Sequence, residues 1–170
     1  MPRYVALLRA VNVGGAGRLA MATLRALCSE AGFRDVTTYI ASGNVVFTSG
    51  AAAARVRAAL EARLLAHAGK SIAVVLRTAA EMAAVRDANP FRDAPAKHTY
   101  VLFLQRRPAR RALRVAGQAD ERVCFGKKEI FVHYPRGMGC SRLRIAAASE
   151  GTARNMTTVA KLAQLAAAQH

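Results

Sequence analysis

The chain has 170 residues, of which 53% are apolar and 21% are charged, so it can build one ordinary domain or two small ones, and disorder is excluded. Lysine and arginine number 26 against ten acidic residues, a formal net charge of +16, and residues 86–170 hold 16 of the bases and six of the acids. Such an excess favours polyanionic partners. Arginine outnumbers lysine 21 to 5, however, and a GC-rich coding sequence would produce that bias without selection for binding.

Composition also bears on location and chemistry. The three cysteines, Cys28, Cys124 and Cys140, are odd in number and widely spaced, so we expect no disulfide framework and a reducing, cytoplasmic location. No apolar run approaches the length of a membrane span, and the run after Met1 is too short for a signal peptide. The four histidines lie more than 30 residues apart, and the acidic residues are scattered. We therefore expect no metal, no cofactor and no catalytic constellation.

The first half of the chain predicts six elements in the order β-α-β-β-α-β. An apolar run without helical spacing predicts a buried first strand, and apolar residues at helical intervals predict each helix. Two β-branched runs around a polar turn predict a hairpin. In order, the expected elements are a strand at 3–9, a helix at 21–31, strands at 36–40 and 45–48, a helix at 51–68 and a strand at 71–76.

The second half repeats this order after a short helix, whose start has the capping-box pattern of Thr78 and Glu81 and which must end before Asn89-Pro90. The expected elements are a strand at 99–104, a helix at 108–117, strands at 122–125 and 129–134, a helix at 141–149, a strand at 152–155 and a C-terminal helix. We therefore predict an α+β fold of two tandem ferredoxin-like (α/β-plait) subdomains. Their expected ranges are 1–77 and 98–170, joined by a linker helix and loop at 78–97.

In this topology the loop after the first strand and the turn of the hairpin emerge at one edge of the sheet. Two interpretations of the polar residues there stay open: local backbone hydrogen bonds, or a pocket for a small anion with Arg9 supplying charge. Three residues near the C-terminus would join that pocket if the chain folds back. The candidate anion-binding or ligand-binding residues are Arg9, Asn12, Gly14, Gly15, Ser42, Gly43, Asn44, Arg154, Asn155 and Lys161.

Two motifs near these loops resemble nucleotide-binding sequences. Residues 15–20 match the G-x-G-x-x-A spacing of a dinucleotide fingerprint, but the next strand belongs to a hairpin and no acidic residue ends it, so we expect no dinucleotide site. Gly69-Lys70-Ser71 lacks the earlier glycine of a phosphate loop and joins a helix to a strand, so we reject it as well.

The same topology gathers cations at one edge of the second subdomain. If the chain around 108–117 is helical, Arg107, Arg110, Arg111 and Arg114 share one face. This face is either solvated, with arginine stems covering apolar surface, or a stripe that follows the phosphates of a nucleic acid. The candidate polyanion-binding residues are Arg106, Arg107, Arg110, Arg111, Arg114, Lys127 and Lys128.

Several separate motifs occur in an order that resembles the bacterial domain-of-unknown-function 1697 family. They are Leu7-Leu8-Arg9, Asn12-Val13-Gly14-Gly15, Ser42-Gly43-Asn44, Asn89-Pro90-Phe91, Tyr134-Pro135 and Arg154-Asn155. The resemblance implies a pair of ferredoxin-like subdomains in a bacterial cytosolic protein and no established activity. The chain departs from the family pattern at Ala10, where the family usually has glycine, and at Met156, where it usually has an aromatic residue.

Two functions follow as hypotheses. The first is a non-enzymatic module that binds nucleic acid or another polyanion through its basic second half. The alternative is an enzyme or sensor for a small phosphorylated or carboxylated metabolite, bound at the Asn12 loop and the Ser42 turn. A scaffold or homodimer that uses an exposed sheet face is a third hypothesis. The sequence does not decide the oligomeric state.

Overall fold

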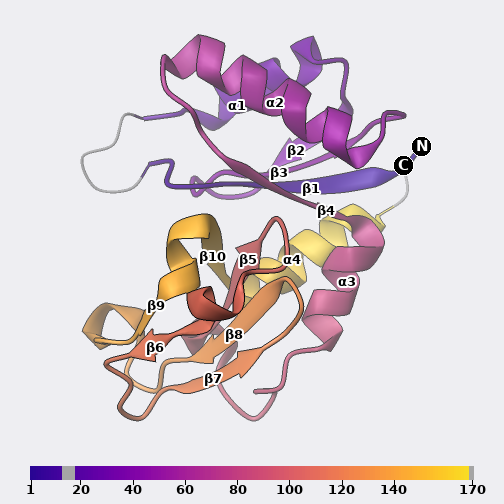
Figure 1. The fold of residues 1–170 in the computed structure, drawn as a ribbon. Coiled ribbons are helices and arrows are strands. Elements are labelled where there is room, and N and C mark those ends of the chain that lie inside the picture. Colours follow the sequence, from indigo (N-terminus) through magenta and orange to yellow (C-terminus); the bar gives the residue numbers. More distant parts are fainter. Residues whose placement is uncertain (13–17, 169–170) are drawn as a thin grey trace. The chain divides into compact units, whose positions relative to one another are not determined.

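A computed structural model describes residues 1–12 and 18–168 (Figure 1). The chain forms two compact units, one of Met1–Ala83 with the C-terminal segment that begins at Leu162, and one of Ala84–Lys161. Each unit contains a four-stranded antiparallel sheet, and the described residues include four α-helices. The protein is therefore a mixed α/β protein with antiparallel sheets.

The first unit follows the predicted order of elements. Its sheet has the strand order β2-β3-β1-β4, and every neighbouring pair is antiparallel. Two helices, α1 (Met21–Glu30) and α2 (Ala53–Ala68), lie together over one face of this sheet (Figure 1). The strands are β1 (Arg3–Leu8), β2 (Arg34–Thr38), β3 (Asn44–Thr48) and β4 (Val74–Thr78).

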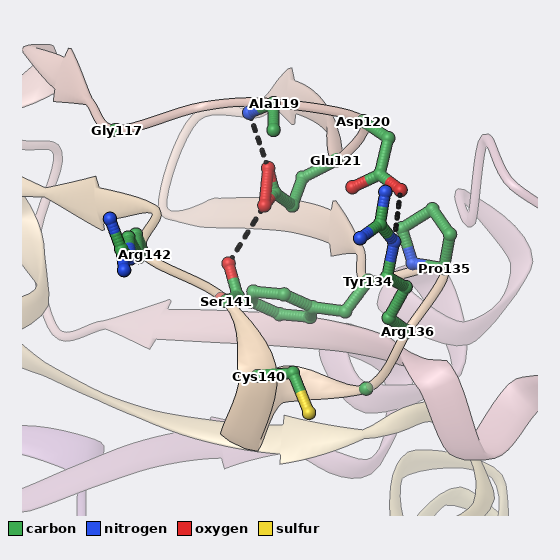
Figure 2. A pocket seen from close by; sticks show the side chains of 11 residues that line it. Gly117, Ala119, Asp120, Glu121, Tyr134, Pro135, Arg136, Cys140, Ser141 and Arg142 are labelled. Carbon is green, nitrogen blue, oxygen red and sulfur yellow. Dashed lines mark hydrogen bonds and ion pairs between the residues drawn. The ribbon is translucent and has the colours of Figure 1, made fainter.

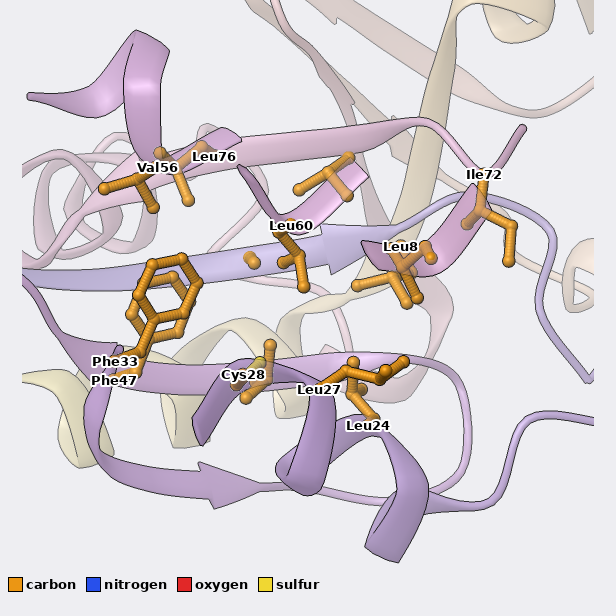
Figure 3. Packing of buried hydrophobic residues seen from close by; sticks show 14 of the residues in the cluster. Leu8, Leu24, Leu27, Cys28, Phe33, Phe47, Val56, Leu60, Ile72 and Leu76 are labelled. Atoms are coloured by element: carbon orange, nitrogen blue, oxygen red, sulfur yellow. The ribbon is translucent and has the colours of Figure 1, made fainter. Parts of the chain in front are cut away.

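Apolar side chains from the sheet and both helices form the core of the first unit (Figure 3). Phe33 stacks on Phe47 of β3, with ring centroids 4.3 Å apart and the planes only 6° from parallel. The spacing that predicted α2 is explained here, because Val56, Leu60 and Leu64 are its buried residues. Cys28 of α1 is fully buried in the same core, and its burial raises the pKa of the thiol to about 12.

Helix ends in this unit are fixed by local hydrogen bonds. Gly69 ends α2 in the left-handed conformation (φ 72°), and its N–H donates to the carbonyl of Leu65 at 2.9 Å. The capping box of α3 (Ala79–Asp87) is confirmed: the N–H of Thr78 donates to the Glu81 carboxylate at 2.8 Å, and the N–H of Glu81 donates to the Thr78 hydroxyl at 3.1 Å.

The second unit has the strand order β10-β5-β8-β7, again antiparallel throughout. A separate pair, β6 (Val115–Ala116) and β9 (Arg144–Ile145), lies outside this sheet. The strands of the sheet are β5 (Thr99–Leu104), β7 (Arg122–Phe125), β8 (Glu129–His133) and β10 (Gly151–Asn155). Short 3-10 helices connect them: η1 (Ala96–His98), η2 (Arg110–Leu113), η3 (Met138–Cys140) and η4 (Ala146–Glu150).

The helices predicted at 108–117 and 141–149 are wrong. The first segment holds η2 and β6, and the second holds β9 and η4. The two segments pair with each other, since Val115 lies opposite Ile145 and the N–H of Ala146 donates to the carbonyl of Arg114 at 3.0 Å. Backbone groups that bond across to a distant segment cannot also close helical turns, and the clustered arginines would repel on a helix face.

The predicted C-terminal helix is confirmed as α4 (Met156–Ala167). The Asn155 carboxamide oxygen accepts the N–H of Thr158 at 2.9 Å, as an N-cap does. Beyond the end of α4, the carbonyl of Ala168 accepts a hydrogen bond from the Arg3 guanidinium at 2.5 Å. Within the described residues, no helix combines the length and the apolar character that crossing a bilayer demands.

Candidate functional site

The loop after β1 and the turn between β2 and β3 meet at one edge of the first sheet, which confirms that expectation of the topology. The Asn12 carboxamide nitrogen donates to the carbonyls of Leu19 at 2.9 Å and Ala41 at 2.7 Å, and its oxygen accepts the N–H of Leu19 at 2.7 Å. One side chain therefore ties the two ends of the loop to the neighbouring turn. Gly14 and Gly15 lie outside the described residues.

The turn itself is held by buried polar contacts. Asn44 is completely buried, and its carboxamide nitrogen donates to the carbonyl of Tyr39 at 3.0 Å and to the Ser42 hydroxyl at 2.8 Å. The Gly43 carbonyl accepts the N–H of Leu8 at 2.8 Å. These contacts match the local backbone role of Asn and Ser in tight turns.

Backbone conformation at this edge is unusual. Ala10, Asn12 and Ile40 all have positive φ, at 55°, 57° and 50°. The left-handed conformation costs a residue with a side chain about 1–2 kcal/mol, and Ile40 is both β-branched and 52% exposed. The glycine that the family usually has in place of Ala10 is explained by this geometry, because glycine adopts positive φ without strain.

A hollow of about 190 Å³ lies beside the same loop, on the side of β4. It is lined by the apolar residues Val11 and Leu19 and by Arg18, His67 and Lys70. The sequence interpretation missed this trio, although the Gly69-Lys70-Ser71 motif drew attention to one member. Three nitrogen-bearing side chains around a small hollow have the chemistry to hold an anion.

The predicted residues near the C-terminus belong to the second unit. Arg154 is only 7% exposed, and its guanidinium donates to the Thr152 hydroxyl at 2.6 Å and the Ala153 carbonyl at 2.9 Å. Burial lowers the pKa of this guanidinium to about 10. Asn155 caps α4, and Lys161 is half-buried on that helix. A role of Arg154, Asn155 and Lys161 in a site with Asn12 stays a prediction.

Two basic loops lie side by side at the edge of the second sheet. The N–H of Leu104, at the end of β5, donates to the carbonyl of Lys128 in the β7–β8 turn at 2.9 Å. Arg106 and Arg107 follow after Gln105, so this segment leaves β5 next to the turn that holds Lys127 and Lys128. We call the predicted set of cations the cationic edge; it comprises Arg106 and Arg107 next to Lys127 and Lys128, and, further along the chain on and after η2, Arg110, Arg111 and Arg114.

The shared helical face predicted for the arginines is wrong, because Arg110 and Arg111 lie on η2 and Arg114 follows it in extended conformation. All five arginines and Lys127 are nevertheless exposed, and Lys128 is half-buried. In the described part of the chain, no hydrogen bond or ion pair engages the side chains of these five arginines or of Lys127.

Two acidic residues of the second unit pair with arginines outside the cationic edge. Asp93 pairs with Arg122 at 3.2 Å, and Asp120 pairs with Arg136 at 3.1 Å. Residues 84–161 carry sixteen bases and six acids, a formal net charge of +10. Seven of those sixteen bases belong to the cationic edge.

An aromatic side chain stands next to the basic turn. Phe125 ends β7, immediately before Gly126-Lys127-Lys128, and is 44% exposed. The sequence interpretation missed it, because a phenylalanine in a strand is usually needed for the core. Its position directly before a basic turn could have indicated that the ring is exposed. By contrast, Phe103 and Phe131 of the same sheet are buried.

A polar pocket of about 170 Å³ lies between the 117–121 and 134–142 segments (Figure 2). The Glu121 carboxylate accepts the N–H of Ala119 at 2.8 Å and the Ser141 hydroxyl at 2.9 Å, and these bonds lower its pKa. Figure 2 shows Cys140, whose thiol is exposed, next to Ser141 on the 134–142 segment. Both carboxylates that line the pocket have partners, since Asp120 accepts a hydrogen bond from Arg136 and Glu121 accepts the two bonds just given. This favours a structural role for them.

Among residues 1–12 and 18–168, no three histidine, cysteine or acidic side chains converge as metal ligands.

These features define a class: a two-unit α/β protein with antiparallel sheets and a cationic edge on its second unit. The family model described as "Protein of unknown function (DUF1697)" matches residues 1–131, and the chain belongs to this family. Its structure is similar to that of the conserved bacterial protein SP0830 from Streptococcus pneumoniae, with a TM-score of 0.76 and 25% sequence identity over 97% of this chain and 98% of that chain. No curated protein matches the sequence.

Proposed function

We propose that the protein binds nucleic acid through the cationic edge of its second unit. The observation that carries the proposal is a run of five exposed arginines, Arg106–Arg114, whose side chains have no ion pair among the described residues and whose first members lie next to the Lys127–Lys128 turn through the Leu104–Lys128 hydrogen bond. Guanidinium groups bind phosphate through two parallel hydrogen bonds, and neutralising phosphates releases counterions. The edge is therefore suited to a sugar-phosphate backbone.

Both units are, in this proposal, variants of the ferredoxin-like plait. The strand orders support this, since β4-β1-β3-β2 and β10-β5-β8-β7 place the first, second, third and fourth strands of each unit in the same positions. Short 3-10 helices in the second unit replace the two helices of the first. The loop after the first strand and the hairpin turn then share an edge in each unit, which is how the cations gather.

Phe125 favours single strands over duplexes. An exposed ring beside a basic turn offers a surface on which an unpaired base can stack, and every base has a face that can do so. Bases inside a duplex are already stacked. We therefore expect little dependence on sequence and tighter binding of single strands.

Fluorescence anisotropy with a labelled 12-nucleotide strand, and with its duplex, tests the proposal. If about six phosphates are contacted, the logarithm of affinity falls against the logarithm of salt with a slope near −4 for the single strand and near −5 for the duplex. The variant Arg107→Gln/Lys127→Gln removes two contacts and reduces the single-strand slope by about 1.4.

The matched control removes two exposed arginines of the first unit, Arg34→Gln/Arg55→Gln, and changes the net charge equally. The proposal expects this control to bind almost as the unaltered protein does. Equal weakening by both double variants would show that net charge, and not the edge, governs binding. Absence of binding at about 50 mM salt, where phosphate contacts are strongest, would refute the proposal.

A second candidate function rests on the hollow beside the Asn12 loop. Arg18, His67 and Lys70 would there hold a small phosphorylated or carboxylated metabolite, as an enzyme or sensor requires. A thermal-shift screen of such compounds tests it, with Lys70→Gln as the variant that should lose the shift. Arg107→Gln/Lys127→Gln should keep the shift, which separates this site from the cationic edge.

A further inference from the structure

The second unit contains a hollow that neither basic loop uses. It measures about 410 Å³, which falls within the range of about 300–1,000 Å³ typical of small-molecule sites. Its floor is the face of the sheet, where Leu102 of β5 and Val132 of β8 are almost fully buried. Leu143 and Ile145 form part of the opposite wall. Every residue that lines it belongs to the second unit.

The hollow exists because of how this sheet face is covered. In the first unit two long helices close the corresponding face, whereas β9 and η4 provide a short cover in the second. Small side chains, Ala148 and Ala153, stand at its border and leave it open. The space is a consequence of the helices that the second unit lacks.

Two tyrosines give the hollow an aromatic wall. Tyr100 and Tyr134 meet edge to face, with ring centroids 5.5 Å apart and planes at 84°. Burial raises the pKa of Tyr134 above its ordinary value, so its phenol remains a proton donor at neutral pH. In the part of the chain that the structure describes, neither phenol has a hydrogen-bond partner.

A single cation stands at the border of this apolar space. The Arg144 side chain lines the hollow, is exposed, and has no hydrogen bond or ion pair among the described residues. The acidic residues Asp120 and Glu121, by contrast, line the neighbouring pocket and are engaged there. Charge complementarity therefore selects an anionic head for an apolar occupant.

We propose that this hollow is a binding site for a small aromatic carboxylate, whose ring packs against the tyrosine wall and whose carboxylate meets Arg144. Aromatic rings pair favourably edge to face or offset at such separations, and a carboxylate accepts from guanidinium with charge-assisted strength. The two phenols supply further donors. The proposal does not depend on nucleic-acid binding.

Isothermal titration with 2-naphthoate tests the site, and 2-naphthalenemethanol serves as the uncharged ligand of the same ring system. We expect the carboxylate to bind roughly tenfold more tightly than the alcohol, the effect of one charge-assisted hydrogen bond at a half-open site. Arg144→Gln should remove this preference and leave the alcohol unaffected. Arg142→Gln removes an exposed arginine that lines the neighbouring pocket, and it should change neither affinity.

A blocking variant tests the location. Ala153→Leu fills the border of the hollow at an exposed position, so it should abolish binding of both ligands while the urea-unfolding transition is retained. Equal affinity for the two ligands, an unchanged preference in Arg144→Gln, or no binding at millimolar ligand would overturn the proposal. So would a dimer in sedimentation velocity that Ala153→Leu converts to monomer, because a second copy of the chain would then occupy the hollow.

Discussion

Replacing Gly43 by alanine probes the close packing that positions the β2–β3 turn. Gly43 has φ 87°, and a Cβ there would lie 2.5 Å from the Val11 Cγ2 and 2.9 Å from the Leu8 Cβ. Both neighbours are buried and have little room to move. A left-handed alanine costs about 1–2 kcal/mol and overpacking a further 1–3 kcal/mol, so Gly43→Ala should lower the free energy of unfolding by about 2–5 kcal/mol.

Gly32 is the matched control. It has the same φ of 87°, but nothing lies within 4 Å of a Cβ built on it. Gly32→Ala therefore carries the conformational cost of about 1–2 kcal/mol without the collision. Urea unfolding followed by circular dichroism, with an unchanged slope against urea, measures both. If Gly43→Ala destabilises the protein no more than Gly32→Ala does, the contact of the turn with the end of β1 is not as described.

Three further outcomes follow from other positions. Ala10→Gly should raise the free energy of unfolding by up to about 1 kcal/mol, because relief of a left-handed strain of about 1–2 kcal/mol exceeds the added freedom of the unfolded chain; a loss of stability in urea would contradict this. The hydrogen bonds to Glu121 lower the pKa of its carboxyl in the folded protein below the ordinary value of 4.5. They therefore stabilise the folded state at pH values above 4.5, and this stabilisation is lost as the pH falls through the lowered pKa. Glu121→Gln should therefore lose less stability on acidification than the unaltered protein, and parallel curves of unfolding free energy against pH would exclude that role. Maleimide at pH 8, read by mass spectrometry, should label the two exposed cysteines in the folded protein and Cys28 only in urea, and rapid labelling of Cys28 in the folded protein would show that its core opens.

The first unit could be predicted from sequence because its elements are specified locally. The spacing of Val56, Leu60 and Leu64 matches one helix face, and the polar turn at residues 41–44 separates two β-branched runs. The neighbourhood of Asn12 and Ser42 followed from the order of elements alone. Complete burial of Asn44 could not be predicted, since it depends on the packing of the turn against the end of β1.

The second unit resisted prediction because distant pairing decides its structure. Val115 and Ile145 are 30 residues apart, yet their pairing replaces two helices that alanine and arginine favour locally. The burial of Arg154 also could not be predicted, because it depends on how β10 is packed within the folded sheet. The side chain bonds to its close neighbours in sequence, Thr152 and Ala153, and sequence spacing does not show that these groups are shielded from water. The exposure of Phe125 depends on its place at the end of an edge strand.

The central claim is that the cationic edge carries the nucleic acid. Titration of a 12-nucleotide single strand into isotopically labelled protein, followed by backbone amide chemical shifts, tests it most directly. The account predicts the largest shifts at residues 105–114 and 125–128, together with small changes throughout the first unit. Shifts centred on the Asn12 loop or the hollow beside Arg18, or none at all at low salt, would contradict it.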